Sequence, residues 1–387
     1  MIAYKKEPLD NLSIHDQLEN VFSKQCISKE ELKTCEEKYP VNFYTPNIFV
    51  RIGLFILTCV IAIFSFGLLS LMSLSSGGED GFIIMLTLFA LISYGALEFM
   101  VHSKNHYKSG VDDALMWMSG IFIVVAFNFK GSLSYLENSM LIFVICSFFT
   151  LRFVNMIMGA IATSALFVMI FLAYINFGDF AKTTAPFLLM AVALLVYFLS
   201  SKKSETKYYK KCLLMTEIVS LACIYIFANY FVIRMLTDSL LYPIQEESHP
   251  ITLGWLLWIF TAIIPFTYIA RGIQKKDVVL IRMGLIFIAA LVFTVRAFYH
   301  VMPAETAMII GGLIMIAIAY TLIKYLKEPK YGFTDEEPNE ANSFARKQIE
   351  SMIIAETFGQ AKTETQAGNA TEFGGGSGGG GGAGGDF

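Results

Sequence analysis

The chain has 387 residues, of which 55% are hydrophobic and only 16% are charged. Soluble domains usually carry about a quarter charged residues, so this composition argues against a soluble globular protein. The formal net charge of -3 supplies no broad basic surface, and we therefore expect no nucleic-acid partner. The six cysteines show no CxxC or other paired metal spacing, which argues against a disulfide framework.

The first 47 residues are polar and lack the apolar core and cleavage site of a signal peptide. Val21 and Phe22 belong to a helical repeat of apolar residues. Ser28 is followed three residues later by Glu31, which is the pattern of a helix capping box. Two prolines then end the helical pattern just before the first long apolar stretch. We expect residues 1–47 to be a short helix-turn-helix lead-in on the cytoplasmic side.

Ten apolar stretches of about spanning length follow, and they predict an all-α, polytopic transmembrane helix bundle over residues 48–326. The stretches cover about 48–72, 81–101, 111–129, 136–150, 155–175, 181–200, 213–233, 251–269, 278–298 and 307–326. The fourth stretch is the shortest. If it did not cross the bilayer, every later span would run in the opposite direction.

The loops between these stretches alternate between rich and poor in Lys and Arg. Five lysines lie between Lys202 and Lys211, whereas the next loop, Thr237 to His249, has neither Lys nor Arg. Basic loops stay in the cytoplasm, so this contrast predicts that both termini are cytoplasmic.

The chain after the last span is expected to have two parts. Residues 327–372 form a polar cytoplasmic tail with a possible short amphipathic helix around Ile349 and Ile353. Residues 373–387 read FGGGSGGGGGAGGDF, which has little apolar area to bury and much backbone entropy to lose. We expect this Gly-rich tail to be disordered.

The sharpest group of chemically active residues lies at the end of the second span. Glu98, His102 and His106 follow one another at intervals of four, so a continuous helix would place them on one face. Asp112 and Asp113 begin the next span. Such a set could hold a metal ion or relay protons. The hydrophilic segment around the histidines favours the alternative, which is an interfacial polar cluster.

Two further acidic residues have candidate partners nearby. Glu217 lies inside the seventh span, one or two helical turns from Lys210 and Lys211, so we interpret it as one half of a structural ion pair. Arg234 and Asp238 are four residues apart and can pair in the same way on the opposite side.

Two backbone features point towards a transport pathway. Gly120 falls inside the third span and Pro265 inside the eighth. If ten spans divide into two halves of five, those halves have inverted topology and the third and eighth spans correspond. Interrupted helices at matched positions are typical of a transporter's central site.

The sequence contains no GxxxxGK[ST], GxSxG, HExxH or GxGxxG motif in a usable context. We therefore name no catalytic residues and predict no cofactor, and we do not expect an enzyme.

The segments VFSKQCISKEELKTCEEKYP and VRIGLFILTCVIAIFSFGLLSLM resemble the start of a group of uncharacterised bacterial polytopic membrane proteins. The segment VRAFYHVMPAETAMIIGGLIMIAIAYTLIKYLKEPK is similar to the last two spans of that group. The glycine-rich end also resembles the endings of several unrelated bacterial membrane proteins. The resemblance implies a multi-pass protein of a bacterial cytoplasmic (inner) membrane, with no activity to carry over.

Our first interpretation is a membrane component that sits in the lipid bilayer and binds a cytoplasmic protein through its N-terminal segment or its C-terminal tail. The alternative is a secondary transporter or ion-coupled carrier. An intramembrane metalloenzyme is the weaker alternative.

Overall fold

The computed structural model describes residues 2–23, 26–131, 133–203, 208–238, 251 and 253–298, with isolated positions between 306 and 324. The chain divides into two compact units, Met1–Asn339 and Glu340–Phe387. The second unit lies outside the described residues, as do the predicted amphipathic helix and Gly-rich tail. The described part of the chain is all-helical and contains no strand, apart from an isolated parallel bridge between Tyr44 and His106.

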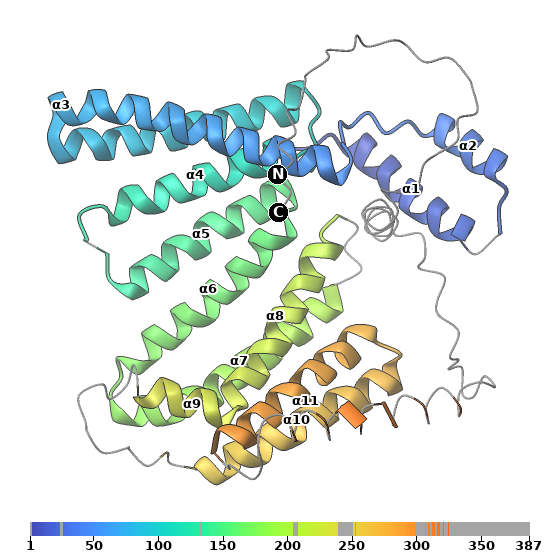
Figure 1. Cartoon of the computed structure of the whole chain (residues 1–387), viewed down its shortest axis with the longest axis vertical. Coiled ribbons are helices and arrows are strands. Elements are labelled where there is room, and N and C mark those ends of the chain that lie inside the picture. The colour runs from blue at the N-terminus through green and yellow to red at the C-terminus, as the bar shows by residue number, and fades with distance from the viewer. Residues whose placement is uncertain are drawn as a thin grey trace, which may run out of the picture. The chain divides into compact units, whose positions relative to one another are not determined.

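Nine helical segments within the described ranges are long and apolar enough to cross a bilayer, so this is a multi-pass membrane protein. They are Ile48–Leu71 and Gly78–Ser103 within α3 (Ile48–Ser103), α4 (Val111–Asn128), α5 (Tyr135–Phe153), α6 (Met156–Ile175), α7 (Asp179–Lys203), α8 (Lys210–Ala228), α10 (Gly254–Lys275) and α11 (Val278–Phe298). Figure 1 shows successive helices as antiparallel neighbours. The predicted tenth span lies mostly outside the described residues.

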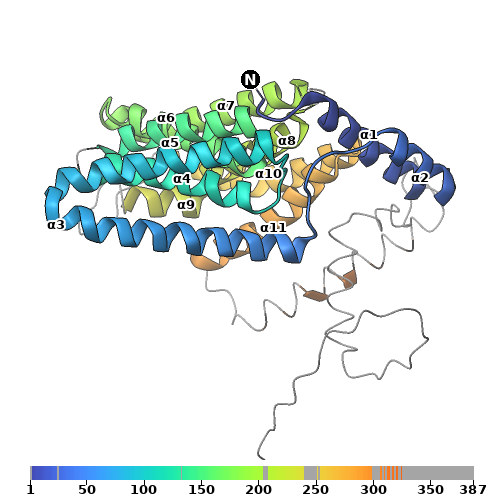
Figure 2. The ribbon, with the colours of Figure 1, turned by 90° about the horizontal axis from the view of Figure 1, so that it is seen from above.

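The α3 segment is a hairpin of two spans. Gly78 has φ 59° and ψ -151° inside it, which is a conformation that glycine adopts without strain. The two legs then run back along each other (Figure 2), and the ring of Phe66 packs edge-on against Phe89 with the centroids 5.5 Å apart. Phe64 and Leu68 of the first leg are 69% and 68% exposed in the protein, so this face is left for lipid.

The fourth span is longer than the sequence predicts. The α5 helix has 19 residues, which corresponds to about 28 Å at 1.5 Å per residue. Its capping box, formed by Ser134 and Glu137, starts the helix before the first apolar residues. A helix of this length is long enough to cross the hydrocarbon core of a bilayer.

The predicted continuous seventh span is wrong. The α8 helix ends at Ala228, and a short helix, α9 (Tyr230–Leu236), follows after Asn229. The side-chain oxygen of Asn229 accepts hydrogen bonds from the backbone N–H groups of Phe231 and Val232 at 2.9 and 3.3 Å. Asn229 therefore caps a new helix instead of continuing the old one.

The lead-in consists of α1 (Lys6–Ser23) and α2 (Lys29–Lys38). The capping box at the start of α2 is confirmed: the backbone N–H of Glu31 donates to Ser28 Oγ at 3.2 Å, and the backbone N–H of Ser28 donates to the Glu31 carboxylate at 2.8 Å.

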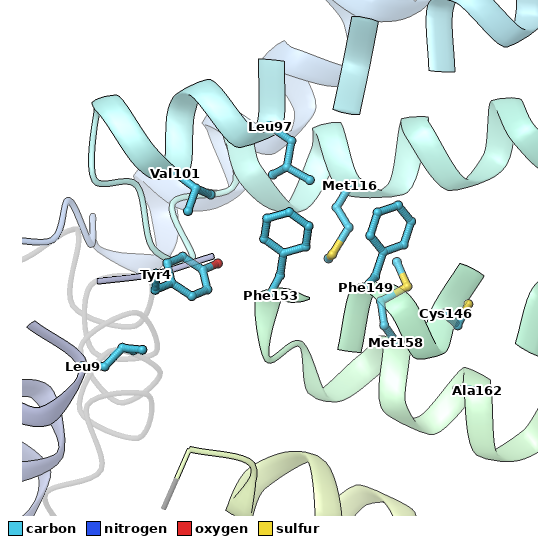
Figure 3. Packing of buried hydrophobic residues seen from close by; sticks show 10 residues of the cluster. All are labelled: Tyr4, Leu9, Leu97, Val101, Met116, Cys146, Phe149, Phe153, Met158 and Ala162. Carbon is cyan, nitrogen blue, oxygen red and sulfur yellow. The ribbon is translucent and has the colours of Figure 1, made fainter. Parts of the chain in front are cut away.

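The end of the bundle that carries the connections 104–110 and 203–210 is called the lysine-rich end below. One of the three buried apolar clusters among the described residues lies near this end and joins the lead-in to four spans, which are the second leg of α3, α4, α5 and α6 (Figure 3). Its members are Tyr4, Leu9, Leu97, Val101, Met116, Cys146, Phe149, Phe153, Met158 and Ala162. At the opposite end Lys130 pairs with Asp80, which joins the connection after α4 to the α3 hairpin.

Candidate functional site

Residues 104–110 connect α3 to α4 and bring the first span against the start of α4. Gly110 has φ 92°, a conformation that favours glycine. A Cβ built on Gly110 would lie 2.1 Å from the carbonyl oxygen of Arg51. Any larger residue would therefore collide with the backbone of the first span, and the absence of a side chain lets Arg51 approach the N-terminus of α4.

Arg51 forms an ion pair that ties three spans together. Its Nη2 lies 2.5 Å from Oδ2 of Asp113, the side chain of which is only 15% exposed. Asn155, at the start of α6, donates from Nδ2 to Oδ1 of the same carboxylate at 3.3 Å. The carboxylate of Asp113, a residue of α4, thus accepts hydrogen bonds from Arg51 of the first span and from Asn155 at the start of α6.

Lys108 lies beside this ion pair but does not share it. Its Nζ lies 5.4 Å from the ring centroid of Tyr107, within the range of a cation–π contact. Among the described residues no carboxylate forms an ion pair with Lys108. Burial lowers the pKa of Lys108, and the positive charges of Lys211 and Arg51 act in the same direction.

Asp112, the neighbour of Asp113, has a different set of contacts. Its Oδ1 accepts hydrogen bonds from the backbone N–H and the hydroxyl of Ser109 at 2.8 and 3.0 Å. Asp112 is 4% exposed and Ser109 is fully buried. The ring Nδ1 of His106 lies 2.7 Å from Ser109 Oγ. The hydrogen bonds that link Asp112, Ser109 and His106 hold the 104–110 connection in its conformation.

Glu98, His102 and His106 do not lie on one continuous helix, because α3 ends at Ser103. Glu98 accepts two hydrogen bonds from Arg152 and one from the hydroxyl of Tyr94, the last at 2.6 Å. Among the described residues, no group of three His, Cys, Asp or Glu side chains is arranged to hold a metal ion.

The N-terminal segment is attached to the lysine-rich end by an aromatic cluster. Tyr4 is 7% exposed, and its ring packs edge-on against Tyr107, Phe43 and Phe153 with centroids 4.9 to 6.4 Å apart. Figure 3 shows Tyr4 below Val101 and to the left of Phe153. Burial raises the pKa of Tyr4 well above its usual value and raises that of Tyr107 to about 12, so both stay neutral.

Backbone and polar contacts strengthen this attachment. The N–H of Ala3 donates to the carbonyl of Arg152 at 2.8 Å. The Tyr208 hydroxyl donates to Asp10 of α1 at 2.7 Å, and Lys211 Nζ lies 3.6 Å from Asp16. The lead-in thus contacts the chain before α4, at the end of α5 and at the start of α8.

Glu217 lies inside α8 without the expected partner. Its Oε1 is buried and has no hydrogen-bond partner among the described residues. Lys211, one of the two predicted partners, lies 3.6 Å from Asp16. One turn further along α8, Ser220 is fully buried, and Tyr225 is 2% exposed. This face of α8 therefore carries polar groups in the interior of the bundle.

The break after α8 carries a satisfied polar network. Asn229 is 3% exposed, and its Nδ2 donates to Thr294 Oγ1 at 2.9 Å. Thr261 Oγ1 donates to the carbonyl of Ala228 at 3.1 Å and accepts from the N–H of Tyr230 at 3.0 Å. These side chains of α10 and α11 bind the backbone groups that the break releases.

Gly120 and Pro265 lie in helices that run without a break. A Cβ on Gly120 would lie 3.3 Å from the ring of Phe149, so Gly120 allows α4 to pack against α5. Pro265 is fully buried inside α10, and a Cβ on Gly284 would lie 3.0 Å from its carbonyl oxygen. Both positions are close helix contacts in the structure.

Sequence reasoning missed Arg51, Lys108, Asn155 and Asn229 as members of polar sites. Arg51 carries a signal, because it is a charge inside the first apolar stretch. Asn229 carries one as well, because an amide within an apolar stretch needs a partner. The predicted pair between Arg234 and Asp238 is confirmed at 3.0 Å.

Comparison with known proteins found no matching family model, no matching curated protein and no matching solved structure. The resemblance of the two end segments to a bacterial membrane protein group therefore stays a prediction.

Proposed function

We propose that this protein is a component of a bacterial cytoplasmic membrane that binds a protein partner through α1 and α2, with the lysine-rich end in the cytoplasm. The observation that carries the proposal is the attachment of the lead-in through Tyr4, Asp10 and Asp16. A helix pair held against the bundle presents one fixed surface, and a preorganised surface binds a partner with less loss of entropy.

The α2 helix is the part of the lead-in that a partner would meet. None of its residues is buried, although a capping box at Ser28 fixes where it begins. It carries four glutamates and three lysines in the segment KEELKTCEEK. A capped helix with no buried residue does little for the packing of its own chain, and we assign it to recognition.

A comparison of three chains tests the partner proposal. The full chain, a chain without residues 26–39 and a chain without residues 373–387 are cross-linked in cells, purified and compared by mass spectrometry. The proposal expects one adduct that the first deletion removes and the second leaves. An adduct removed only by the second deletion would assign recognition to the Gly-rich tail instead. An unchanged adduct set in both deletions would overturn recognition by either segment.

The orientation is supported by Lys104, Lys108 and Lys210, which lie at the same end of the bundle as the lead-in. Single cysteines at positions 130 and 202, in a chain with its six native cysteines replaced, test it. A membrane-impermeant maleimide should label position 130 in intact cells and position 202 only after lysis. The reverse pattern would contradict the orientation.

A second function, an ion-coupled carrier, is favoured by one specific observation. Glu217 keeps a buried carboxylate oxygen without a described partner inside a membrane span. Ionisable residues at such depth commonly serve proton or ion movement. In proteoliposomes, Glu217→Gln should abolish proton uptake that accompanies a solute gradient, whereas Glu79→Gln, an exposed acidic residue of α3, should leave it unchanged. Equal uptake in both variants would remove the carrier function.

A further inference from the structure

A cavity of about 410 Å³ lies at the lysine-rich end between the first span, α4 and α6. Its polar wall is formed by Arg51, Lys108, Asp113 and Asn155. A volume of this size is within the range of small-molecule sites, which is about 300–1,000 Å³. The residues that line it come from three different spans, so the cavity exists only in the assembled bundle.

The polar wall carries one positive charge in excess. Asp113 is neutralised by Arg51 and accepts a further hydrogen bond from Asn155. No described carboxylate forms an ion pair with Lys108, although the charge of Asp113 in the same wall acts on it, and its Nζ lies 5.4 Å from the ring centroid of Tyr107. Because Asp113 is already paired with Arg51, the half-buried ammonium of Lys108 favours an anion that enters the cavity.

The start of α4 faces the same cavity. Gly110 lines it and is the N-cap residue of α4, and no side chain forms a capping hydrogen bond there. The first N–H groups of an 18-residue helix and the positive end of its dipole favour an anion at this position. Asp112 and Asp113 in the first turn already compensate part of this dipole, so Lys108 is the stronger of the two features that favour negative charge.

The remaining wall of the cavity is apolar and reaches the lipid-facing surface. Ile52 of the first span is 52% exposed and Ile157 of α6 is 49% exposed. Phe55 and Trp117 complete this apolar wall. Arg51 lies near the beginning of its span, at the depth where lipid headgroups meet the hydrocarbon core. The cavity thus combines an anion-binding wall with an exit towards acyl chains.

We propose that this cavity binds the phosphate-bearing headgroup of an anionic phospholipid, with the Lys108 ammonium and the N-terminus of α4 facing the phosphate and the acyl chains passing Ile52 and Ile157. Basic pockets between membrane helices are known to hold such headgroups. A metal cation is disfavoured because the carboxylate of Asp113 is already paired and Lys108 repels positive charge. The proposal does not depend on the partner or on the orientation, since both faces of a bilayer carry phosphate.

Native mass spectrometry of the full chain tests the proposal. Wild type, Lys108→Gln, Lys108→Arg and Lys104→Gln are purified from the same membranes and delipidated, and phosphatidylglycerol or phosphatidylcholine is then titrated back. Lys104 is an exposed lysine of the same connection and is the matched control. Loss of one charge-assisted hydrogen bond should weaken phosphatidylglycerol retention about tenfold in Lys108→Gln. Lys108→Arg and Lys104→Gln should stay close to wild type.

Equal phosphatidylglycerol retention in Lys108→Gln and wild type would overturn the proposal. If Lys108→Gln does not fold, the wild type decides it, because equal retention of phosphatidylcholine and phosphatidylglycerol would also overturn it. Inorganic phosphate is titrated separately, with the melting temperature as the measurement. A different outcome is that phosphate raises the melting temperature of the wild type but not of Lys108→Gln, while phosphatidylglycerol is not retained in preference to phosphatidylcholine. That result would assign the cavity to a free anion and overturn the lipid as its occupant.

Discussion

The carboxylate of Glu98 and the guanidinium of Arg152 form a double hydrogen-bonded ion pair between α3 and α5. Arg152 Nε lies 2.9 Å from Oε1 and Nη2 lies 3.1 Å from Oε2. The hydroxyl of Tyr94 also donates a hydrogen bond to Oε1 of Glu98. The backbone carbonyl of Arg152 accepts a hydrogen bond from the N–H of Ala3, so this one residue connects two spans and the N-terminal segment.

Breaking this pair from one side should destabilise the protein. The side chains of Glu98 and Arg152 are 25% and 32% exposed, so Glu98→Gln removes a negative charge from a partly buried, doubly hydrogen-bonded ion pair. We expect a loss of about 1–3 kcal/mol of unfolding free energy. Chemical unfolding in detergent measures it, with Glu79→Gln as the exposed control. A double variant that also carries Arg152→Gln should recover part of the loss, and strictly additive losses would contradict a direct interaction.

Gly110→Ala should destabilise the protein more than Gly131→Ala. Both glycines have positive φ, 92° and 62°, so both substitutions strain the backbone. Only the Cβ at position 110 meets the Arg51 carbonyl oxygen, whereas nothing lies within 4 Å at position 131. We expect a cost of about 1 kcal/mol at Gly131 and at least about twice that at Gly110. Thermal unfolding of the two variants measures the difference, and equal melting temperatures would contradict the close packing.

Tyr107 should make the protein lose stability at alkaline pH. Burial raises its pKa from 10.0 to about 12 in the folded protein, so the folded state keeps the proton longer than the unfolded state. The stabilisation is complete below the unfolded pKa and is lost as the pH rises through the folded pKa. The raised pKa of Tyr107 contributes about 2–3 kcal/mol to the free energy of unfolding at neutral pH.

Tyr107→Phe has no such proton, so the alkaline decline in its melting temperature should be shallower than in wild type. Tyr4 has a raised pKa too and is retained in both proteins, which makes the difference between the two curves specific to Tyr107. Identical curves would contradict the neutral, buried state of Tyr107.

Asn229→Ala should destabilise the end of the bundle that contains α9. The substitution removes the cap of α9 and leaves the Thr294 hydroxyl without its amide partner. Loss of a helix cap and of a buried hydrogen bond together predict a cost of about 2–3 kcal/mol. Hydrogen exchange of the α9 amides measures it locally. Asn176→Ala, at an exposed helix end, is the control, and equal protection of α9 in both variants would contradict the prediction.

The membrane fold could be predicted from the sequence because it depends on local hydropathy. Each span is an apolar stretch whose backbone is satisfied within its own helix, so no distant information is needed to find it. The capping box at Ser28 and the pair of Arg234 and Asp238 are local as well, and both predictions are confirmed. The break at Asn229 was missed because its stabilising partners, Thr261 and Thr294, lie on other helices.

The polar sites could be predicted only in part for the same reason. Glu98 was singled out, but its partner Arg152 lies 54 positions away and becomes its neighbour only when α5 packs against α3. A shared face for Glu98, His102 and His106 requires one continuous helix, but α3 ends at Ser103, so it contains Glu98 and His102 and not His106. Hydropathy gives no information on which helices are neighbours, and that neighbourhood decides which charges meet.

The position of Tyr4 has a consequence for how the protein is made. A ribosome synthesises Tyr4 at the beginning of the chain, long before Tyr107 and Phe153, the rings that it packs against. The lead-in must therefore wait outside the bilayer until α3, α4 and α5 have inserted. Tyr4 can dock only after the first four spans have assembled, because Tyr107 and Phe153 come together only when α3, α4 and α5 pack.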